Sequence, residues 1–275
     1  MTDQYAVIGN PVAHSKSPLI HGEFARQTGQ DISYTTILAP LDGFRDAALE
    51  FRDMGGKGLN VTLPFKHEAW NLVNERADYA LDAGAVNTIE FLDGRMVGYN
   101  TDGLGLVRDI KDNLQCPIRG KRLLLMGAGG ATYGVMEPLL HEQPGQVVVA
   151  NRTLDKAVRL AGHFEKFQRF AAHGVSVRPY EALGGAQFDL VINATSAGLS
   201  DEMPPLPDAV FAAGALAYDM VYGKTTPFLR FAQARGARIA DGTGMLVEQA
   251  AESFFIWRGM RPQTAPVIAR LRGEG

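Results

Sequence analysis

Residues 122–134 read RLLLMGAGGATYG, and this stretch decides the fold of the second half of the chain. The apolar run at residues 123–126 predicts a buried strand, and Gly127, Gly129 and Gly130 predict a tight turn into a helix. A strand, a glycine-rich turn and a helix N-terminus form a binding site for a pyrophosphate, because glycines let backbone amides approach the phosphate. The run departs from a strict G-x-G-x-x-G at Thr132, so it also fits a glycine-rich turn without a ligand.

The end of the next predicted strand selects the nucleotide. An NAD-binding chain usually carries an acidic residue here for the ribose hydroxyls, whereas this chain reads Asn151-Arg152-Thr153, beginning 24 positions after the first glycine of the turn. Arg152 offers a planar charged group that suits a 2′-phosphate, with the Thr153 hydroxyl beside it and Lys156 one turn later. The sequence therefore predicts NADP as the cofactor. The alternative is a plain helix start, in which Thr153 caps the helix and Arg152 is only exposed.

Predicted strands and helices alternate along the chain. Apolar, β-rich runs predict strands at residues 5–8, 34–38, 58–61, 86–90, 122–126, 147–150, 188–193, 215–219 and 238–240. Helical patterns occur at residues 18–28, 43–54, 103–114, 245–257 and 266–271. This alternation is typical of mostly parallel sheets covered by helices, so we expect an α/β fold of two domains with a boundary near residue 103. The sequence leaves open which of the two domains is covered by the C-terminal helices, residues 245–257 and 266–271.

Composition excludes several classes of protein. The 275 residues suffice for two domains of roughly 150 residues, and 46% hydrophobic with 21% charged residues fit a globular chain. A net charge of -3 without a basic cluster predicts no nucleic-acid partner, and the lack of a long apolar run predicts no membrane partner. The one cysteine, Cys116, and the missing leader pattern predict the cytoplasm. Scattered histidines without HExxH or CxxC predict no metal site.

Polar side chains cluster where predicted strands of the first half end. They are Ser15 and Ser17 in GNPVAHSKSP, Asn60, Thr62, Lys66 and His67 in NVTLPFKH, Asn87 in AGAVNT, and Asn100, Thr101 and Asp102 in YNTD. The carboxyl ends of such strands face the ligand crevice, so these groups suit a small polyol acid and a proton transfer, with NADP carrying the hydride. Each cluster also has a structural alternative: the serines fit a turn, Lys66 a solvated surface and Asp102 a helix N-cap.

Taken together and in this order, the segments resemble the shikimate dehydrogenase family. Its members are NADP-dependent enzymes that reduce 3-dehydroshikimate to shikimate in the chorismate pathway of aromatic amino acid biosynthesis. The resemblance runs along the whole chain and rests on nine collinear motifs: GNPVAHSKSPLIH, GLNVTLPFKHEA, AGAVNTI, GYNTDGLG, GAGGA, NRT, INATSAGL, YDMVYGKTTPFL and DGTGMLVEQAAESF.

The resemblance implies a role for particular residues of this chain. Lys66 becomes the catalytic acid/base, and Asp102 holds the reacting hydroxyl and orients the lysine. The implied substrate contacts are Ser15, Ser17, Thr62, Asn87, Tyr222 and Gln249. The implied cofactor contacts are Asp78, Gly127, Ala128, Gly129, Gly130, Ala131, Asn151, Arg152, Thr153, Lys156, Met220, Gly242 and Met245.

The resemblance also implies which function each domain has. Residues 1–103 with 243–275 would form the substrate-binding, catalytic domain, and residues 104–242 a Rossmann-type NADP-binding domain, so the C-terminal helices return to the first domain. Two departures concern the phosphate contacts: Thr132-Tyr133 stands where the family often has Ser-Arg, and Lys156 where it often has a second arginine. The expected partner is the small-molecule substrate. We expect the chain to be either a monomer or a homodimer.

Two rival functions remain on sequence grounds. A quinate/shikimate dehydrogenase that uses NAD would favour an acidic residue at the position of Arg152, which this chain lacks. A catalytically silent cofactor-binding protein, such as a redox sensor, would not need both Lys66 and Asp102. The intact pair therefore favours an enzyme.

Overall fold

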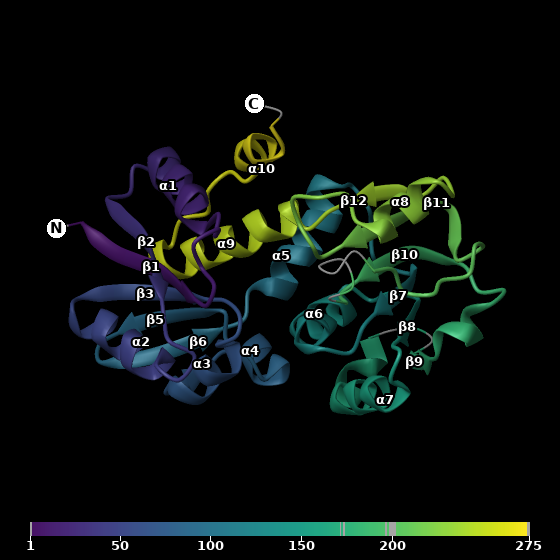
Figure 1. The fold of residues 1–275 in the computed structure, drawn as a ribbon, viewed down its shortest axis with the longest axis horizontal. Coiled ribbons are helices and arrows are strands. Elements are labelled where there is room, and N and C mark those ends of the chain that lie inside the picture. The colour runs from purple at the N-terminus through teal and green to yellow at the C-terminus, as the bar shows by residue number, and fades with distance from the viewer. Residues whose placement is uncertain (1, 171, 173, 196, 198–201, 274–275) are drawn as a thin grey trace. The chain divides into compact units, whose positions relative to one another are not determined.

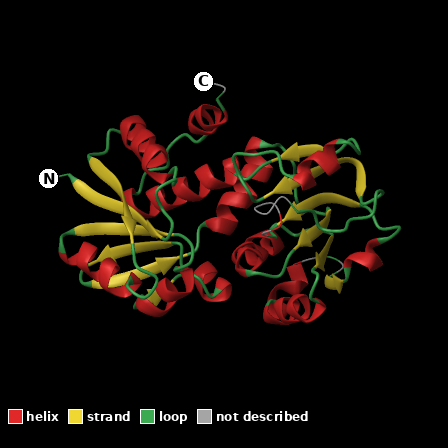
Figure 2. Cartoon of the chain, viewed as in Figure 1, coloured by secondary structure: helices red, strands yellow, loops and turns green. Residues whose placement is uncertain are grey.

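Unbroken apolar runs such as RLLLM and QVVVA build a sheet that is buried on both faces. In the computed structural model, which describes residues 2–170, 172, 174–195, 197 and 202–273, the chain divides into two units. The first unit comprises residues 1–105 and 247–275, and the second comprises residues 106–246. Figure 1 labels the elements of each unit, and Figure 2 shows strands flanked by helices in both.

The second unit has a fully parallel sheet of six strands among the described residues. The strands are β7 (Arg122–Met126), β8 (Gln146–Ala150), β9 (Val175–Arg178), β10 (Phe188–Asn193), β11 (Phe211–Asp219) and β12 (Arg238–Ala240). Their order across the sheet is β12-β11-β10-β7-β8-β9, which is the doubly wound order of dinucleotide-binding domains. The direction of winding reverses between β7 and β10. Ligands of such folds bind outside the carboxyl ends of the strands at this reversal.

Alternate residues of these strands enter two separate cores. Leu123, Leu125 and Val147 pack on the face covered by α6 (Gly130–His141) and α7 (Leu154–His163). Leu124 and Val148 pack on the opposite face, with α8 (Pro227–Gln233) and the short helix η3 (Tyr180–Leu183). Because both faces are covered, most residues of the central strands are apolar.

The first unit has a mixed sheet among the described residues. Its strands are β1 (Asp3–Gly9), β2 (Ile32–Leu38), β3 (Gly56–Val61), β4 (Glu75–Arg76), β5 (Thr88–Leu92) and β6 (Arg95–Tyr99), in the order β2-β1-β3-β5-β6-β4. β1 is parallel to β2 and β3, and β4 is parallel to β6, whereas β5 is antiparallel to β3 and β6. Asp93 and Gly94 join β5 to β6 with φ angles of 48° and 78°, as a tight hairpin turn requires.

Three strands were not predicted, and one helix differs from its prediction. The missing strands are β4, β6 and β9, which are short and lack an apolar run. The strand expected at residues 86–90 begins two residues later. The helix expected at residues 103–114 is α5 (Asp102–Arg108), followed by one turn of π-helix, η1 (Asp109–Asn113). The 3.6-residue period of a sequence does not distinguish such a π turn.

Helices cover both faces of the first sheet. They are α1 (Ser17–Thr28), α2 (Phe44–Asp53), α3 (Lys66–Leu72), α4 (Asp78–Ala83) and α9 (Thr243–Arg258). α10 (Ala265–Arg272) contacts α1 instead, where Arg270 forms an ion pair with Glu23. The short η2 (Glu165–Phe170) belongs to the other unit. α9 returns to the first sheet, where the Trp257 indole donates a hydrogen bond to the Ile89 carbonyl at 3.1 Å and stacks on Tyr5. The expected return of the C-terminal helices is confirmed.

Among the described residues, every helix is too short or too polar to cross a bilayer.

His21 of α1 lies at the centre of an aromatic cluster beneath α9. Its ring is fully buried and stacks on Tyr34 with a centroid distance of 4.2 Å and an interplanar angle of 5°. Phe24 packs at its edge. Burial lowers the pKa of His21 from 6.5 to about 3, against a smaller opposing effect of Asn60. His21 is therefore neutral in the folded protein.

This burial predicts acid sensitivity of the first unit. Between pH 6.5 and about 3 the unfolded chain binds a proton at His21 that the folded chain does not, so stability is complete above pH 6.5 and falls below it. We expect His21 to contribute a loss of about 1.4 kcal/mol per pH unit in that range, and His21→Phe to remove this slope. Urea unfolding at several pH values measures it. Tryptophan fluorescence reports the first unit alone, because Trp70 and Trp257 both lie there.

The control is His67→Gln, which changes an exposed histidine of the same unit. An unchanged pH slope in His21→Phe, equal to that of His67→Gln, would contradict the assignment of His21 as a buried neutral group.

Candidate active site

A lysine and an aspartate meet at the carboxyl edge of the first sheet. Lys66 is the first residue of α3, after β3, and Asp102 is the first residue of α5, after β6. The Lys66 Nζ donates a hydrogen bond to Asp102 Oδ2 at 2.6 Å. The two side chains are 28% and 16% exposed, so the ion pair is largely shielded and still accessible to a ligand. Asp102 thus has a specific ionic partner, which a plain N-cap does not need.

Local packing fixes where α3 begins. Phe65, immediately before Lys66, is fully buried against the core of the first sheet. The backbone N–H of Val86 donates to the Lys66 carbonyl oxygen at 2.9 Å, which ties the start of α3 to the segment that leads into β5. The lysine backbone is therefore held from both sides while its ammonium group stays at the surface of the site.

Asn87 connects the aspartate to the rest of the sheet. Its amide nitrogen donates to Asp102 Oδ1 at 2.8 Å and to Thr101 Oγ1 at 2.9 Å, and its amide oxygen accepts from the Thr101 N–H at 2.9 Å. Asn87 is 3% exposed. Because one carboxylate oxygen of Asp102 binds the ammonium and the other binds this amide, the orientation of the carboxylate is fixed. Gln249 of α9 lies beside the same amide at 3.5 Å.

A buried hydrogen-bond network lies directly beneath Asn87. The Asn60 amide nitrogen donates to Thr88 Oγ1 at 3.1 Å and to Ser253 Oγ at 3.0 Å, and the Thr88 hydroxyl donates to the Asn87 amide oxygen at 3.0 Å. The Tyr34 hydroxyl donates to the Asn60 amide oxygen at 2.7 Å. These residues come from four different elements, so the network fixes the strand ends and α9 relative to one another.

The predicted hydroxyl contacts lie at neighbouring strand ends of the same unit. Ser15 and Ser17 follow β1, where the Ser17 N–H donates to Ser15 Oγ at 3.2 Å. Thr62 follows β3, and its N–H donates to the Ile8 carbonyl of β1 at 3.0 Å. Burial raises the pKa of Tyr34 well above 10, against a smaller opposing effect of the Ser17 hydroxyl. The structure therefore brings these hydroxyls to adjacent strands, β1 and β3.

In the second unit the glycine-rich turn has the geometry of a phosphate site. Gly127 has a φ of +103°, which disfavours any side chain, and a Cβ there would press on the Ala194 backbone. Gly129 and Gly130 are exposed at the start of α6, with open space where their side chains would be. Backbone amides at the N-terminus of this 12-residue helix are thus accessible to an anion.

Thr132 explains one departure from the family pattern. Its side chain is fully buried, and its hydroxyl donates to the Gly127 carbonyl at 3.0 Å, which closes the turn. Tyr133 instead packs its ring against His163 of α7 with a centroid distance of 5.4 Å. Ala128 is buried and Ala131 is exposed. The substituted residues therefore preserve the turn rather than open it.

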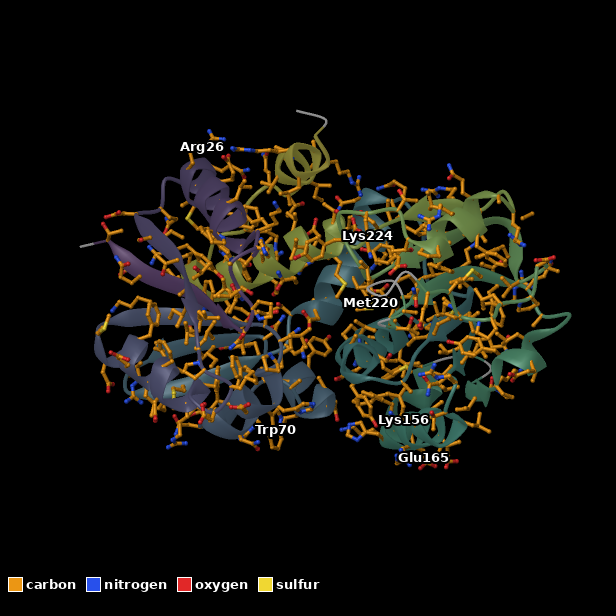
Figure 3. All side chains as sticks on the ribbon, in the orientation of Figure 1. Arg26, Trp70, Lys156, Glu165, Met220 and Lys224 are labelled. Carbon is orange, nitrogen blue, oxygen red and sulfur yellow. The ribbon has the colours of Figure 1, made fainter. Side chains whose placement is uncertain are left out.

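The segment after β8 presents its charges to solvent. Arg152, Thr153 and Lys156 are exposed, and Figure 3 labels Lys156 on α7. Thr153 occupies the N-cap position of α7, but its side chain accepts no capping hydrogen bond. The Asn151 side chain donates to the Thr153 carbonyl at 2.7 Å and shapes this bend. Among the described residues no carboxylate forms an ion pair with Arg152, so its guanidinium is available to an anion.

Arg152 also affects a neighbouring phenol. Burial raises the pKa of Tyr180 to about 12, against a smaller opposing effect of the Arg152 charge. This places the guanidinium near the start of η3. The donors of the turn, of Arg152 and of Thr153 fit a dinucleotide that carries an extra phosphate.

The remaining predicted residues lie in both units, and Met220 and Met245 belong to the same apolar cluster as Ala128 of the turn. Met220, Tyr222, Gly242 and Met245 belong to the second unit, where the Gly242 N–H donates to the Val221 carbonyl at 3.0 Å. Asp78 is exposed at the start of α4 in the first unit. Nowhere in the described part of the chain do three or more His, Cys, Asp or Glu side chains form a group that could hold a metal ion.

One unit with a doubly wound parallel sheet and a glycine-rich turn, together with a second unit that carries a lysine–aspartate pair, defines the class of nicotinamide-dependent oxidoreductases. Family models agree in detail. The shikimate dehydrogenase substrate binding domain matches residues 7–89, shikimate/quinate 5-dehydrogenase matches residues 109–200, and the shikimate 5′-dehydrogenase C-terminal domain matches residues 242–272. The chain belongs to the shikimate dehydrogenase family, and the resemblance predicted from its motifs is confirmed.

Relatives match over nearly the full length. The chain is 59% identical to the shikimate dehydrogenase (NADP(+)) of Nitrosospira multiformis, covering 100% of this chain and 98% of the relative. An Ael1 enzyme from Pseudomonas putida is 49% identical with a TM-score of 0.92, covering 98% of each chain. Shikimate 5-dehydrogenase from Thermus thermophilus, in complex with NADP(H) and shikimate, is 33% identical with a TM-score of 0.87, covering 99% and 100%. The predicted two-domain α/β fold is confirmed.

Sequence reasoning missed the support beneath the site. Asn60 was noted at a strand end, but Tyr34, Thr88 and Ser253 gave no signal of their own. Ser253 lies four residues after Gln249 on α9, so it shares a helix face with a predicted site residue, and that spacing could have indicated it. The motif INATSAGL, residues 192–199, falls partly outside the described residues.

Proposed function

We propose that the chain catalyses the reversible, NADPH-dependent reduction of 3-dehydroshikimate to shikimate, a step of the chorismate pathway to aromatic amino acids. The observation that carries the proposal is the Lys66–Asp102 pair, fixed by Asn87 at the carboxyl edge of the first sheet. A shielded ammonium group held by a carboxylate is the acid that a ketone reduction needs.

The proton transfer follows from the chemistry of the ion pair. In the reduction, NADPH supplies a hydride to the ketone carbon of the substrate. The Lys66 ammonium donates a proton to the ketone oxygen as that oxygen gains negative charge, and in the reverse direction the neutral amine accepts the proton from the hydroxyl. Asp102 orients the ammonium through its Oδ2 atom and hydrogen-bonds the reacting hydroxyl.

The substrate is held by neutral polar groups of the first unit. We assign the carboxylate and ring hydroxyls of shikimate to Ser15, Ser17, Thr62, Asn87 and Gln249, together with Tyr222 of the second unit. The amide of Asn87 already has a fixed orientation, so it binds a hydroxyl without reorganisation. Hydroxyl and amide groups distinguish a polyol from an apolar ring, because a missing substrate hydroxyl would leave them unpaired.

The cofactor is assigned to the second unit. The pyrophosphate would lie on the turn formed by Gly127, Ala128, Gly129, Gly130 and Ala131, and the 2′-phosphate on Asn151, Arg152, Thr153 and Lys156. Met220, Gly242, Met245 and Asp78 are assigned to the nicotinamide side. The open positions at Gly129 and Gly130 and the unpaired guanidinium of Arg152 support this assignment.

We further infer a cytoplasmic enzyme that functions without nucleic-acid or membrane partners, as a monomer or a homodimer. The one cysteine, Cys116, supports a reducing compartment. Burial raises the pKa of its thiol, so Cys116 is a poor nucleophile.

Initial rates with shikimate or quinate, each with NADP+ or NAD+, test the proposed function directly. We expect the highest kcat/KM for shikimate with NADP+. A higher value for quinate would favour the quinate-type rival, and the absence of any rate with all four combinations would favour a silent cofactor-binding protein.

Lys66→Ala is expected to lower kcat by about 100- to 10,000-fold, because it removes the general acid, while the KM for shikimate changes little. Steady-state kinetics measure both constants. Lys57→Ala, at an exposed lysine of β3, serves as the matched control and should behave as the wild type. A kcat for Lys66→Ala within about threefold of the wild type would rule out the acid/base role.

Arg152→Ala is expected to weaken NADP+ binding by about 10- to 150-fold and to leave NAD+ nearly unchanged, because a charge-assisted hydrogen bond contributes about 1.5 to 3 kcal/mol. Thr153 and Lys156 compensate in part, which favours the lower end of this range. Arg152→Asp should have a larger effect, because it repels the phosphate. The ratio of kcat/KM for NADP+ over NAD+ measures the change.

Arg159→Ala is the control, since Arg159 is an exposed arginine of α7, the helix that begins two residues after Arg152. If Arg152→Asp kept the ratio of the wild type, Arg152 would not contact the phosphate and would be only an exposed residue at a helix start.

A further inference from the structure

Asp219 is a fully buried carboxylate to which the proposed mechanism gives no role. It is the last residue of β11, and it accepts three hydrogen bonds. Asn193 Nδ2 and Thr226 Oγ1 donate to its Oδ2 atom at 3.0 Å and 2.6 Å, and the Val221 N–H donates to its Oδ1 atom at 3.0 Å. No cation among the described residues forms an ion pair with it. Its partners are therefore neutral dipoles.

These three donors surround one short segment of chain, residues 220–226. Asn193 ends β10 and pairs in register with Asp219, so it lies on the neighbouring strand. Val221 lies inside the segment. Thr226 ends it as the N-cap of α8, where its hydroxyl also accepts from the Leu229 N–H. One carboxylate thus joins both ends of the segment, at Val221 and Thr226, to the neighbouring strand.

Further contacts hold the first residue of the segment, Met220. Its N–H donates to the Asn193 carbonyl at 3.0 Å. A Cβ at Gly242 would overlap the Met220 carbonyl oxygen, so the segment and the turn before α9 are in close contact. Figure 3 labels Met220 and Lys224 on this segment. The backbone of Met220 is therefore confined on two sides, directly after Asp219.

The residue before Asp219 holds the other methionine assigned to the nicotinamide side. The Tyr218 hydroxyl donates to Asp109 Oδ2 at 2.7 Å and accepts from the Met245 N–H at 3.3 Å. Side chains alternate across a strand, so Tyr218 anchors one face of β11 and Asp219 the other. The end of β11 is consequently fixed on both faces immediately before Met220.

We propose that Asp219 is a positioning residue that sets the backbone of residues 220–226, and through it the placement of Met220 and Tyr222 for hydride transfer. This inference rests on the proposed function, which assigns those two residues to the nicotinamide and the substrate. An ionised carboxylate only accepts hydrogen bonds, so it suits three converging donors. An asparagine of the same shape would present an NH2 group to at least one of them.

The test compares Asp219→Asn with Asp189→Asn. Asp189 is a carboxylate of β10 at the opposite end of the same sheet, where it accepts three hydrogen bonds from Arg122. Amide hydrogen exchange of the ligand-free chain reports the segment without any activity measurement. For Asp219→Asn we expect exchange at residues 220–226 to become about tenfold faster or more, and for Asp189→Asn no change there.

Kinetics give the second readout. Asp219→Asn should lower kcat/KM for shikimate by about 10- to 100-fold, because a displacement of about 1 Å has such an effect, while the Kd of NADP+ changes by less than about threefold. Asp189→Asn should keep the wild-type kcat/KM. Wild-type exchange and wild-type kcat/KM in Asp219→Asn would overturn the proposal. Equal losses in both variants would also overturn it, because they would indicate a general effect on stability.

A second pair of variants tests the same hydrogen bond from its donor, in case the Asp219→Asn variant does not fold. Thr226→Val removes the hydroxyl that donates to Asp219 without changing the size of the side chain, and Thr226→Ser restores it. We expect Thr226→Val to accelerate exchange and lower kcat/KM in the same direction, and Thr226→Ser to recover most of both. Failure of the serine to recover them would contradict the role of this hydrogen bond.

The two proposals fail in different ways. If the wild type showed no activity with shikimate and NADP+, the proposed function would be wrong, whereas exchange at residues 220–226 would still show whether Asp219 holds the segment. If the wild type were active and Asp219→Asn matched it in both readouts, only the positioning role would be wrong.

Discussion

The ion pair between Lys66 and Asp102 is the interaction on which the candidate site depends. Two charges that are mostly removed from water need a close partner, because the loss of hydration costs several kcal/mol per ion. Each charge here has that partner at 2.6 Å, although 36 residues separate the two in sequence. Asn87 binds the second carboxylate oxygen, so the pair has one geometry rather than several. The strand ends and helix starts of the first unit are arranged around this requirement.

Both units use a buried amide to fix a carboxylate at the end of a strand. Asn87 holds Asp102 in the first unit, and Asn193 holds Asp219 in the second. The difference lies in the other partners of each carboxylate. Asp102 also binds an accessible cation, whereas among the described residues Asp219 binds only neutral donors and is fully buried. In our two proposals, the same local design serves proton transfer in one unit and backbone placement in the other.

The sequence predicted those strands and helices whose burial produces a periodic or continuous pattern of apolar residues. The bounds of β7 match the predicted strand because a central parallel strand that is buried on both faces has a nearly continuous apolar run. The bounds of β10 and β12 match as well, although β10 contains Asp189 and Asn193 and β12 is an edge strand that begins with the exposed Arg238. β6 and β4 were missed, since a short half-exposed strand has no such run, although Asp93-Gly94 is a recognised hairpin signal. Lys66, Asn87 and Asp102 were found from motifs. The hydrogen bonds beneath them depend on how α9 packs, so the contact between Ser253 and Asn60 could not be predicted from the sequence, even though Ser253 shares a helix face with Gln249.

A double-mutant cycle on the ion pair tests the central claim most directly. If Asp102 assists the chemical step by orienting Lys66, its substitution should have little further effect once the ammonium is gone. We predict that kcat of Lys66→Ala/Asp102→Asn lies within about threefold of kcat of Lys66→Ala, while Asp102→Asn alone is slow. If the two single losses instead multiplied in the double variant, Asp102 and Lys66 would act independently, and the account given for the site would be contradicted.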